Sequence, residues 1–496
     1  MSSSDSNTHA GEAVVVKEEV SSPTVEMGAG VPPAMLHPAI LNTIAHHIGS
    51  VSVHHEVGSS SLAAAPSMQE PAATTVWAPL LGVREFMWHC AAALDAGNVA
   101  AVNAYLLAMS CLTSADGDPT QRVAFAFAEA LGRRALHVLL PGLSWALQHQ
   151  LAGQQPPPAP ACAAARRCFD SLCPILRVAA SAANHAIVAA TEGDRFVHVV
   201  DLGGAGADQW LDLLRLLAAR HEGAPPPFLR LSVVSEQEEY LCHAAGTLTQ
   251  EAVRLHIPFV FNPVRSHIDR LDAPGVAAAL GVDPREALVI TSTLQLHRLI
   301  ADEASAAIPA AAAADHLGVP AAPPHQMTRA DELLRALRDL SPKLVVLTEQ
   351  EADHNSGGLW VRVSNAFDYY SALFGDLEAG AGAPRASAER AAVERLVLRE
   401  EIMDIVAREG SSRRERHERM VSWAQRMGVA GFEPAPAMRH NVFEDAELLA
   451  LQWGADGTLR YWVREEDAYV VVYSRMTTPV FSVTAWRPAP ARMTGN

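Results

Sequence analysis

Four residues that follow two apolar runs have the types and spacing of a site for a nucleotide-like cofactor. They are Asp201, Gly203, Gly206 and Glu236. Glycines after a first strand let the backbone approach a dinucleotide or S-adenosylmethionine, and a carboxylate after the second strand holds the ribose hydroxyls. In the register Asp-x-Gly-x-Gly-x-Gly, however, Ala205 and Ala207 replace two glycines. The four residues are therefore candidates for a ligand pocket, and no cofactor is predicted.

For two polar residues of the first apolar run, His198 and Asp201, the sequence context favours structural roles. His198 stands between two valines, which predicts a hydrogen-bonded core residue. For Asp201 we expect a carboxylate that accepts backbone N–H groups at the start of the following helix, with ligand orientation as the alternative.

Two further polar groups leave alternatives open. The first is Glu349, Glu351, Asp353, His354 and Asn355. It follows another apolar run, where it forms either a ligand pocket or a hydrogen-bonded loop network. The second, Arg413 to Arg419, predicts a solvated helix face with i, i+4 pairs. Its alternative pairs Arg416 and Glu418 with the polar edge of the sheet. The sequence contains no Ser-His-Asp order, phosphate loop, zinc spacing or paired carboxylates, so no catalytic residue and no metal ligand is predicted.

The elements that must position these residues alternate between short apolar runs and helical stretches. The runs are 196–202, 229–234, 258–264, 287–292 and 344–349. Continuous apolar strands separated by helices predict a parallel sheet that is covered on both faces. Residues 468–474 and 480–486 flank a short turn with Pro479, which predicts an antiparallel hairpin. The fold class is therefore α/β, and the sheet resembles that of the methyltransferase class of Rossmann-like folds.

The N-terminal half predicts two other kinds of structure. Residues 1–75 lack periodicity and predict a disordered region. From residue 76 to 191 apolar residues recur at helical spacing, as in Val123, Phe127 and Leu131, which predicts a mainly helical cap. The α/β core is assigned to residues 192–490, with a mobile Ala/Pro-rich insert at about 304–326.

Composition narrows the class of protein. The formal charge of -17 argues against broad nucleic-acid binding, because phosphate neutralisation needs an excess of Lys and Arg. The sequence has no apolar run long enough to span a membrane, so no membrane association is expected. Its six cysteines include no Cys-x-x-Cys pair, which predicts reduced, mostly buried thiols.

A series of motifs in fixed order resembles the GRAS family of plant transcriptional regulators over residues 76 to 490. The central match is Val197 to Asp201 with Gln209 and Trp210, similar to the family's Val-His-Ile-Ile-Asp motif. Phe367-Asp-Tyr-Tyr370, Arg399-Glu400 and the ending Ser482-Val-Thr-Ala-Trp486 match later motifs in the same order. Thr484 replaces the usual serine. Within the family, the chain is most similar to the scarecrow-like branch linked to gibberellin signalling.

The resemblance implies a nuclear regulator of transcription that acts mainly through protein contacts, without enzymatic activity. The implied partners are DELLA-type repressors, zinc-finger transcription factors and other GRAS proteins, with homo- or hetero-dimerisation open and DNA contact expected to be indirect. Two alternatives stay open. One is an S-adenosylmethionine-dependent methyltransferase, or a small-ligand-binding protein on the same fold. The other is direct DNA binding through Arg-bearing residues 408–426.

Overall fold

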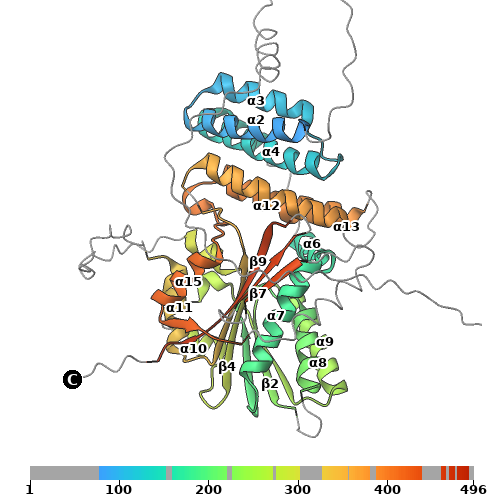
Figure 1. Ribbon diagram of the computed structural model, residues 1–496, viewed down its shortest axis with the longest axis vertical. Coiled ribbons are helices and arrows are strands. Elements are labelled where there is room, and N and C mark those ends of the chain that lie inside the picture. The colour runs from blue at the N-terminus through green and yellow to red at the C-terminus, as the bar shows by residue number, and fades with distance from the viewer. Residues whose placement is uncertain are drawn as a thin grey trace, which may run out of the picture. The chain divides into compact units, whose positions relative to one another are not determined.

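The computed structural model describes residues 78–151, 159–220, 226–271, 275–301, 327–355, 357–379, 387–437, 460–464, 469–474 and 477–490. The described residues form two compact units, which we call the helical unit and the α/β unit (Figure 1). The expectations for residues 1–75 and for the insert at 304–326 lie outside the described residues. No helix among the described residues is long and apolar enough to cross a membrane.

In its described residues the helical unit contains four helices and the first turns of a fifth. They are α2 (Ala78–Asp95), α3 (Val99–Leu112), α4 (Pro119–Leu139), α5 (Pro141–Leu151) and the start of α12 (Leu359–Ala379). Asp118 caps α4 in a reciprocal capping box with Gln121, and Pro119 occupies the first helical turn. Val123, Phe127 and Leu131 are fully buried, and the ring of Phe127 meets that of Phe367 edge to face at 5.5 Å. The predicted helical periodicity is confirmed here.

The α/β unit contains the remaining helices. They are α6 (Ala159–Leu172), α7 (Pro174–Ala190), α8 (Ala207–Ala218), α9 (Glu238–Arg254), α10 (Val276–Leu280), α11 (Arg329–Asp339), the rest of α12, α13 (Ala388–Val393), α14 (Arg399–Ala407) and α15 (Met420–Val429). Short 3-10 turns are η1 (Ile268–Arg270), η2 (Leu296–Ala301) and η5 (Gly410–Ser412), and η4 (Glu394–Leu398) is a π-helical turn.

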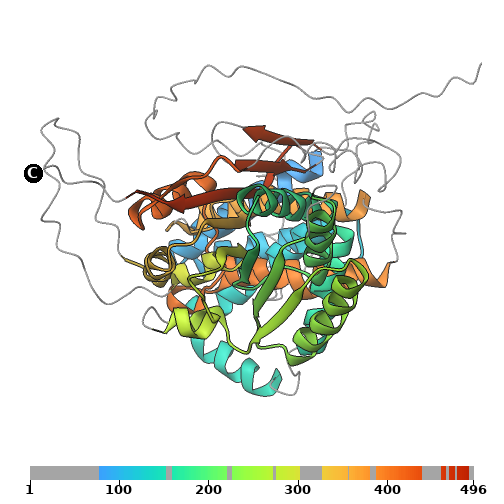
Figure 2. The same ribbon diagram turned by 90° about the horizontal axis from the view of Figure 1, so that it is seen from below.

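The described strands of the α/β unit form a single mixed sheet (Figures 1 and 2). Its strands are β1 (Phe196–Asp201), β2 (Phe228–Val234), β3 (Phe259–Val264), β4 (Ala287–Thr293), β5 (Leu344–Gln350), β6 (Phe432–Pro434), β7 (Arg460–Arg464), β8 (Tyr469–Tyr473) and β9 (Pro479–Pro488). The order is β3-β2-β1-β4-β5-β9-β8-β7, and β6 pairs with β9. β1 to β5 are parallel, whereas β9 runs antiparallel to β5 and β8. The α/β class, the five parallel strands and the C-terminal hairpin are confirmed. The sequence interpretation missed β6 and β7.

The boundary between the two units differs from the predicted division at residue 191. α6 and α7 belong to the α/β unit, because α7 packs against α8, β5, β8 and β9. Its apolar face, with Ala179, Ala182 and Ala186 at 0 % exposure, covers the sheet. Small side chains at helical spacing predict a helix but do not say which surface it covers, so the sequence placed α7 in the wrong unit.

The last strand, β9, lies inside the sheet, between the parallel strand β5 and the antiparallel strand β8. Residues of β9 from Val480 to Trp486 expose at most 5 % of their surface, so both faces of this strand are covered, as predicted. Trp486 belongs to a core cluster with Trp423 and Met427 of α15. No disulfide joins any of the six cysteines, all of which lie in described residues. Cys90 and Cys173 are buried as expected, but Cys162 and Cys168 are half-buried and Cys111 and Cys242 are exposed, so the expectation of burial was wrong for these four.

Candidate functional site

The glycine turn after β1 is folded onto the chain's own β4. Gly203 and Gly204 have φ values of 111° and 92°, and the carbonyl of Gly203 accepts the N–H of Thr293 at 3.2 Å. A Cβ on Gly204 would lie 1.7 Å from the carbonyl oxygen of Thr293. Both the positive φ and this close approach require glycine. The glycines thus have a structural reason that involves no ligand.

The side chain of Asp201 stabilises this turn by a hydrogen bond to its backbone. This side chain is fully buried, and its Oδ1 accepts the N–H of Gly203 at 2.8 Å. The predicted role as a backbone acceptor is confirmed, except that the donor lies in the turn and not in α8. Burial raises the pKa of Asp201 to about 7, against the opposing effect of the hydrogen bond from the Gly203 N–H. Gly206 is the residue that precedes α8, and its carbonyl accepts the N–H of Gln209 at 3.2 Å.

Glu236, the fourth candidate, has a different neighbour. Its carboxylate lies 3.1 Å from the guanidinium of Arg270, and 47 % of its side chain is exposed. The hydroxyl of Tyr240, on the helix that follows, donates to the carbonyl of Ala205 in the glycine turn at 2.8 Å. The structure therefore gathers Asp201, Gly203 and Gly206 at one turn, whereas Glu236 lines a separate cleft.

This cleft has a volume of about 420 Å³ and lies beyond the carboxyl ends of β2, β3 and β4. Its lining is charged, and the charged side chains form ion pairs with one another. The pairs are Arg270 with Glu236, Arg298 with Glu415, Arg408 with Asp404 and Arg414 with Asp269. Because each guanidinium has a carboxylate beside it, the cleft presents no excess of either sign.

Residues 413–419 form part of the wall of this cleft, and the predicted helix is absent there. The segment is extended, and the residues that are buried alternate along it: Arg413, Glu415 and His417. Asn355 donates to Glu418 at 2.8 Å and accepts from Arg416 at 3.1 Å. The alternative, in which Arg416 and Glu418 pair with the polar edge of the sheet, is therefore the correct one. A backbone with period 2 satisfies these contacts, because it directs every second side chain inward.

The polar group after β5 is accordingly a hydrogen-bonded network, the second of its two alternatives. The backbone N–H of His354 donates to the carbonyl of His417 at 2.9 Å, and the carboxylate of Glu351 accepts the N–H of Met420 at 2.8 Å. These bonds fasten the loop after β5 to the extended segment.

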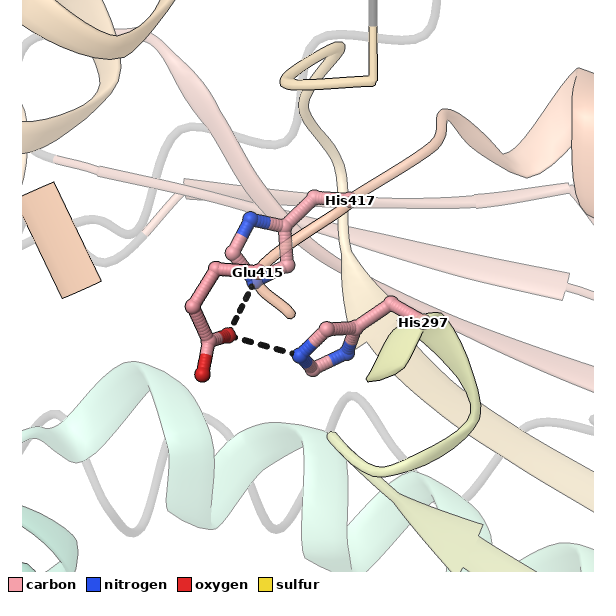
Figure 3. Close-up of side chains that lie close together, drawn as sticks. All are labelled: His297, Glu415 and His417. Atoms are coloured by element: carbon pink, nitrogen blue, oxygen red, sulfur yellow. Dashed lines mark hydrogen bonds and ion pairs between the residues drawn. The ribbon is translucent and has the colours of Figure 1, made fainter. Parts of the chain in front are cut away.

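The buried side chains of residues 413–419 form part of a cluster of histidines and carboxylates (Figure 3). Nδ1 of His297 is 2.8 Å from Glu349, and its Nε2 is 2.8 Å from Glu415. Burial opposes the charged form of His297, but these two carboxylates outweigh it and raise the pKa of His297 to about 9. Burial and the neighbouring His297 lower the pKa of His417 to about 4.

The sequence interpretation did not select His297. It follows β4 in the run Leu296-His-Arg-Leu299, where two leucines flank the polar pair His297 and Arg298 and no spacing typical of a site stands out. Its position directly after a buried parallel strand is the signal that could have found it, since ligand-binding side chains gather at that edge. His198, by contrast, fulfils its prediction: it is fully buried and 2.8 Å from the hydroxyl of Ser232.

The helical unit carries a different feature, an exposed apolar surface. Four large apolar residues fall within eight positions at the junction of α4 and α5, with exposures of 42 to 63 %. They are Val138, Leu140, Leu143 and Trp145, which we call the α4–α5 surface.

Comparisons with known proteins agree on one family. The model of the GRAS domain family matches residues 83–487. Scarecrow-like protein 3 of Arabidopsis thaliana is 35 % identical over 80 % of this chain and 87 % of its own. The DELLA protein DWARF8 of Zea mays is 32 % identical over 81 % of this chain, which spans 60 % of that protein. Among solved structures, SCL7 of Oryza sativa aligns with a TM-score of 0.65 and 27 % identity, covering 83 % of this chain and all of that one.

Proposed function

The chain belongs to the GRAS domain family, and on this premise we propose that it is a nuclear regulator of plant transcription that acts through protein contacts. Its relatives include both scarecrow-like and DELLA proteins, which supports a role in gibberellin-linked development. The proposed partners are DELLA-type repressors, other GRAS proteins and zinc-finger transcription factors, so that DNA is reached indirectly.

The observation that carries this proposal is the distribution of exposed apolar side chains. Of the twelve large hydrophobic residues that are exposed in the described part of the chain, seven belong to the helical unit. The α4–α5 surface supplies four of them, including Trp145 at 63 % exposure. Clustered apolar residues with an exposed tryptophan are typical of protein interfaces.

The charged residues give less support to the other two functions. Within 408–426, Arg408, Arg414 and Arg426 pair with carboxylates of the chain itself, and Arg413 is 3 % exposed, whereas Arg419 is exposed. The first four guanidinium groups are engaged by carboxylates or buried, which disfavours a role in neutralising DNA phosphates. For a methyltransferase, the carboxylate expected on the ribose is that of Glu236, which is paired with Arg270.

The test is binding of the purified full-length protein to a purified DELLA protein, measured by biolayer interferometry. We expect Trp145→Ser combined with Leu143→Ser to weaken binding at least ~10-fold, because the loss of a hot-spot aromatic typically costs 2 kcal/mol or more. The matched control is Val429→Ser on α15, which removes an apolar side chain of comparable exposure, 67 %, from the α/β unit. Unchanged affinity in the double variant, or equal loss in the control, contradicts the assignment of the α4–α5 surface.

Two further measurements separate the alternatives. A gel shift with the isolated protein on promoter fragments at moderate salt is expected to be negative, and a specific shift would favour direct DNA binding. Calorimetry with S-adenosylmethionine is expected to give no heat. Micromolar binding that Asp201→Ala and Glu236→Ala both abolish would favour the enzyme.

A further inference from the structure

Three buried side chains from two distant segments bring their polar atoms to one point. His297 comes from η2, which follows β4, and Glu415 and His417 come from the extended segment at 413–419 (Figure 3). Oε2 of Glu415 lies 2.8 Å from Nε2 of His297 and 3.2 Å from Nε2 of His417. The three possible ligand atoms all lie within 4.8 Å of one another.

The set of donor atoms is one that zinc selects. Two imidazole nitrogens and one carboxylate oxygen form the protein part of many three-ligand zinc sites. Ligand atoms about 2.1 Å from a tetrahedral zinc ion are ~3.4 Å apart. The two contacts to Glu415 are shorter than this by a few tenths of an ångström, so a small outward movement of the three side chains would accommodate the ion.

In each of these three side chains, the polar atom that points away from the point of convergence already has a hydrogen-bond partner. Nδ1 of His297 contacts Glu349 at 2.8 Å, and Nδ1 of His417 contacts Nδ1 of His354 at 2.8 Å. Oε1 of Glu415 accepts from Arg298 at 2.8 Å. Zinc ligands typically have such outer partners, which fix the ring orientation and leave one atom for the metal. Here the remaining atoms are the three that converge, of which Nε2 of His297 and Oε2 of Glu415 also lie within hydrogen-bond distance of each other.

Hydrogen bonds among these three side chains leave one of the converging atoms, Nε2 of His417, without a partner. Nε2 of His417 is buried and has no hydrogen-bond partner, although Oε2 of Glu415 lies 3.2 Å away. A buried nitrogen without a partner is costly, and a metal ion at the point of convergence would satisfy it.

We propose that His297, Glu415 and His417 bind a zinc ion. Three protein ligands leave one of the four tetrahedral positions for water. Glu415 also lines the polar cleft, which is the side from which the ion would enter. The ion would join the loop after β4 to the segment at 413–419, and so hold in place one wall of that cleft.

The experiment measures zinc uptake and thermal stability of the full-length chain after treatment with EDTA and desalting. Histidine pairs at His46–His47 and His54–His55, outside the described residues, offer a competing site. All proteins compared therefore carry Gln at these four positions. In this background, zinc at low micromolar concentration is expected to bind with a stoichiometry of one. It should raise the melting temperature by roughly 5 °C, because a ligand that binds only the folded state stabilises it.

His417→Gln is expected to abolish both the uptake and the thermal shift, and His243→Gln, which removes an exposed histidine on α9, to leave them unchanged. X-ray absorption of the zinc-loaded parent protein provides a test that needs no variant at the site. Two imidazoles and one carboxylate around the ion support the proposal. Absence of zinc uptake, uptake that His417→Gln retains, or sulfur ligands in the absorption spectrum would overturn it.

Discussion

Replacing Gly204 with alanine tests whether the glycine turn exists for packing. The methyl group would be placed 1.7 Å from the carbonyl oxygen and 2.8 Å from the carbonyl carbon of Thr293. These are backbone atoms of β4, which pairs with both β1 and β5, so they cannot move aside as a flexible side chain would. Either the turn leaves β4 or the central strands separate.

The expected cost has two parts. A non-glycine residue with positive φ costs about 1–2 kcal/mol. The collision with β4 adds at least the loss of the bond from Thr293 N–H to Gly203, 3.2 Å long, and of the packing beneath it, about 2 kcal/mol more. We therefore expect Gly204→Ala to lower the free energy of unfolding by roughly 3–4 kcal/mol.

Two control glycines separate these parts. Gly193 also has a positive φ, 80°, but a Cβ there would meet nothing within 4 Å, so Gly193→Ala measures the strain alone, about 1–2 kcal/mol. Gly246 lies inside α9 with open space around it, and Gly246→Ala should stabilise the protein by about 0.5–1 kcal/mol.

The assay is urea unfolding, followed by tryptophan fluorescence and far-UV circular dichroism. If Gly204→Ala costs no more than Gly193→Ala, the turn does not require its close approach to β4. The space between the turn and β4 would then be large enough for a side chain or for part of a ligand.

Three further predictions concern the core and its buried charges. Trp486→Ala should lower the free energy of unfolding by about 3–5 kcal/mol, because the side chain is 5 % exposed within a core cluster; cooperative melting with little loss would instead indicate a peripheral tail. Arg426→Met should cost about 3–5 kcal/mol in urea unfolding, since it leaves the carboxylates of Asp331 and Glu418 buried without their cation, which lies 2.9 and 2.8 Å from them; a neutral effect would show that the carboxylates find other donors. The raised pKa of Asp201, about 7 against 3.8, means that the folded state holds its proton more tightly than the unfolded state. Its contribution to stability is therefore complete below pH 4 and is lost as the pH rises through 7, by up to ~4 kcal/mol. Asp201→Asn should match the wild type at pH 4 and exceed its stability at pH 8; lower stability at pH 8 would mean that the N–H donors compensate the buried carboxylate.

The strands were predictable because their signal is local. β1, β2, β4 and β5 are apolar runs whose residues are mostly buried, whereas β3 buries only Val264. Continuous apolar runs differ from amphipathic helices in the sequence itself. The same holds for the start of α4, where Asp118, Pro119 and Gln121 cap the helix through bonds that span three residues. Interactions between near neighbours can be inferred from spacing alone.

Residues 413–419 were misjudged because their partners are distant in sequence. A run of alternating charges is compatible with a solvated helix. Contacts with distant segments make the extended form favourable, among them the loop after β5 and the carboxylate of Asp404, which accepts the N–H groups of Arg414 and Glu415 at 2.7 and 2.8 Å. The separation of Glu236 from the glycine turn was unpredictable for a similar reason, since its partner Arg270 follows a different strand.

The sequence by itself determined the family, the α/β class, the five parallel strands and the C-terminal hairpin, since apolar periodicity and motif order are properties of the linear chain. Only the tertiary structure brought His297 within 2.8 Å of Glu415, across 118 positions, and assigned α7 to the sheet. A buried polar cluster forms where loops from several strand ends meet. The hydrogen bonds that stabilise it exist only after the sheet has formed, and no local pattern encodes them.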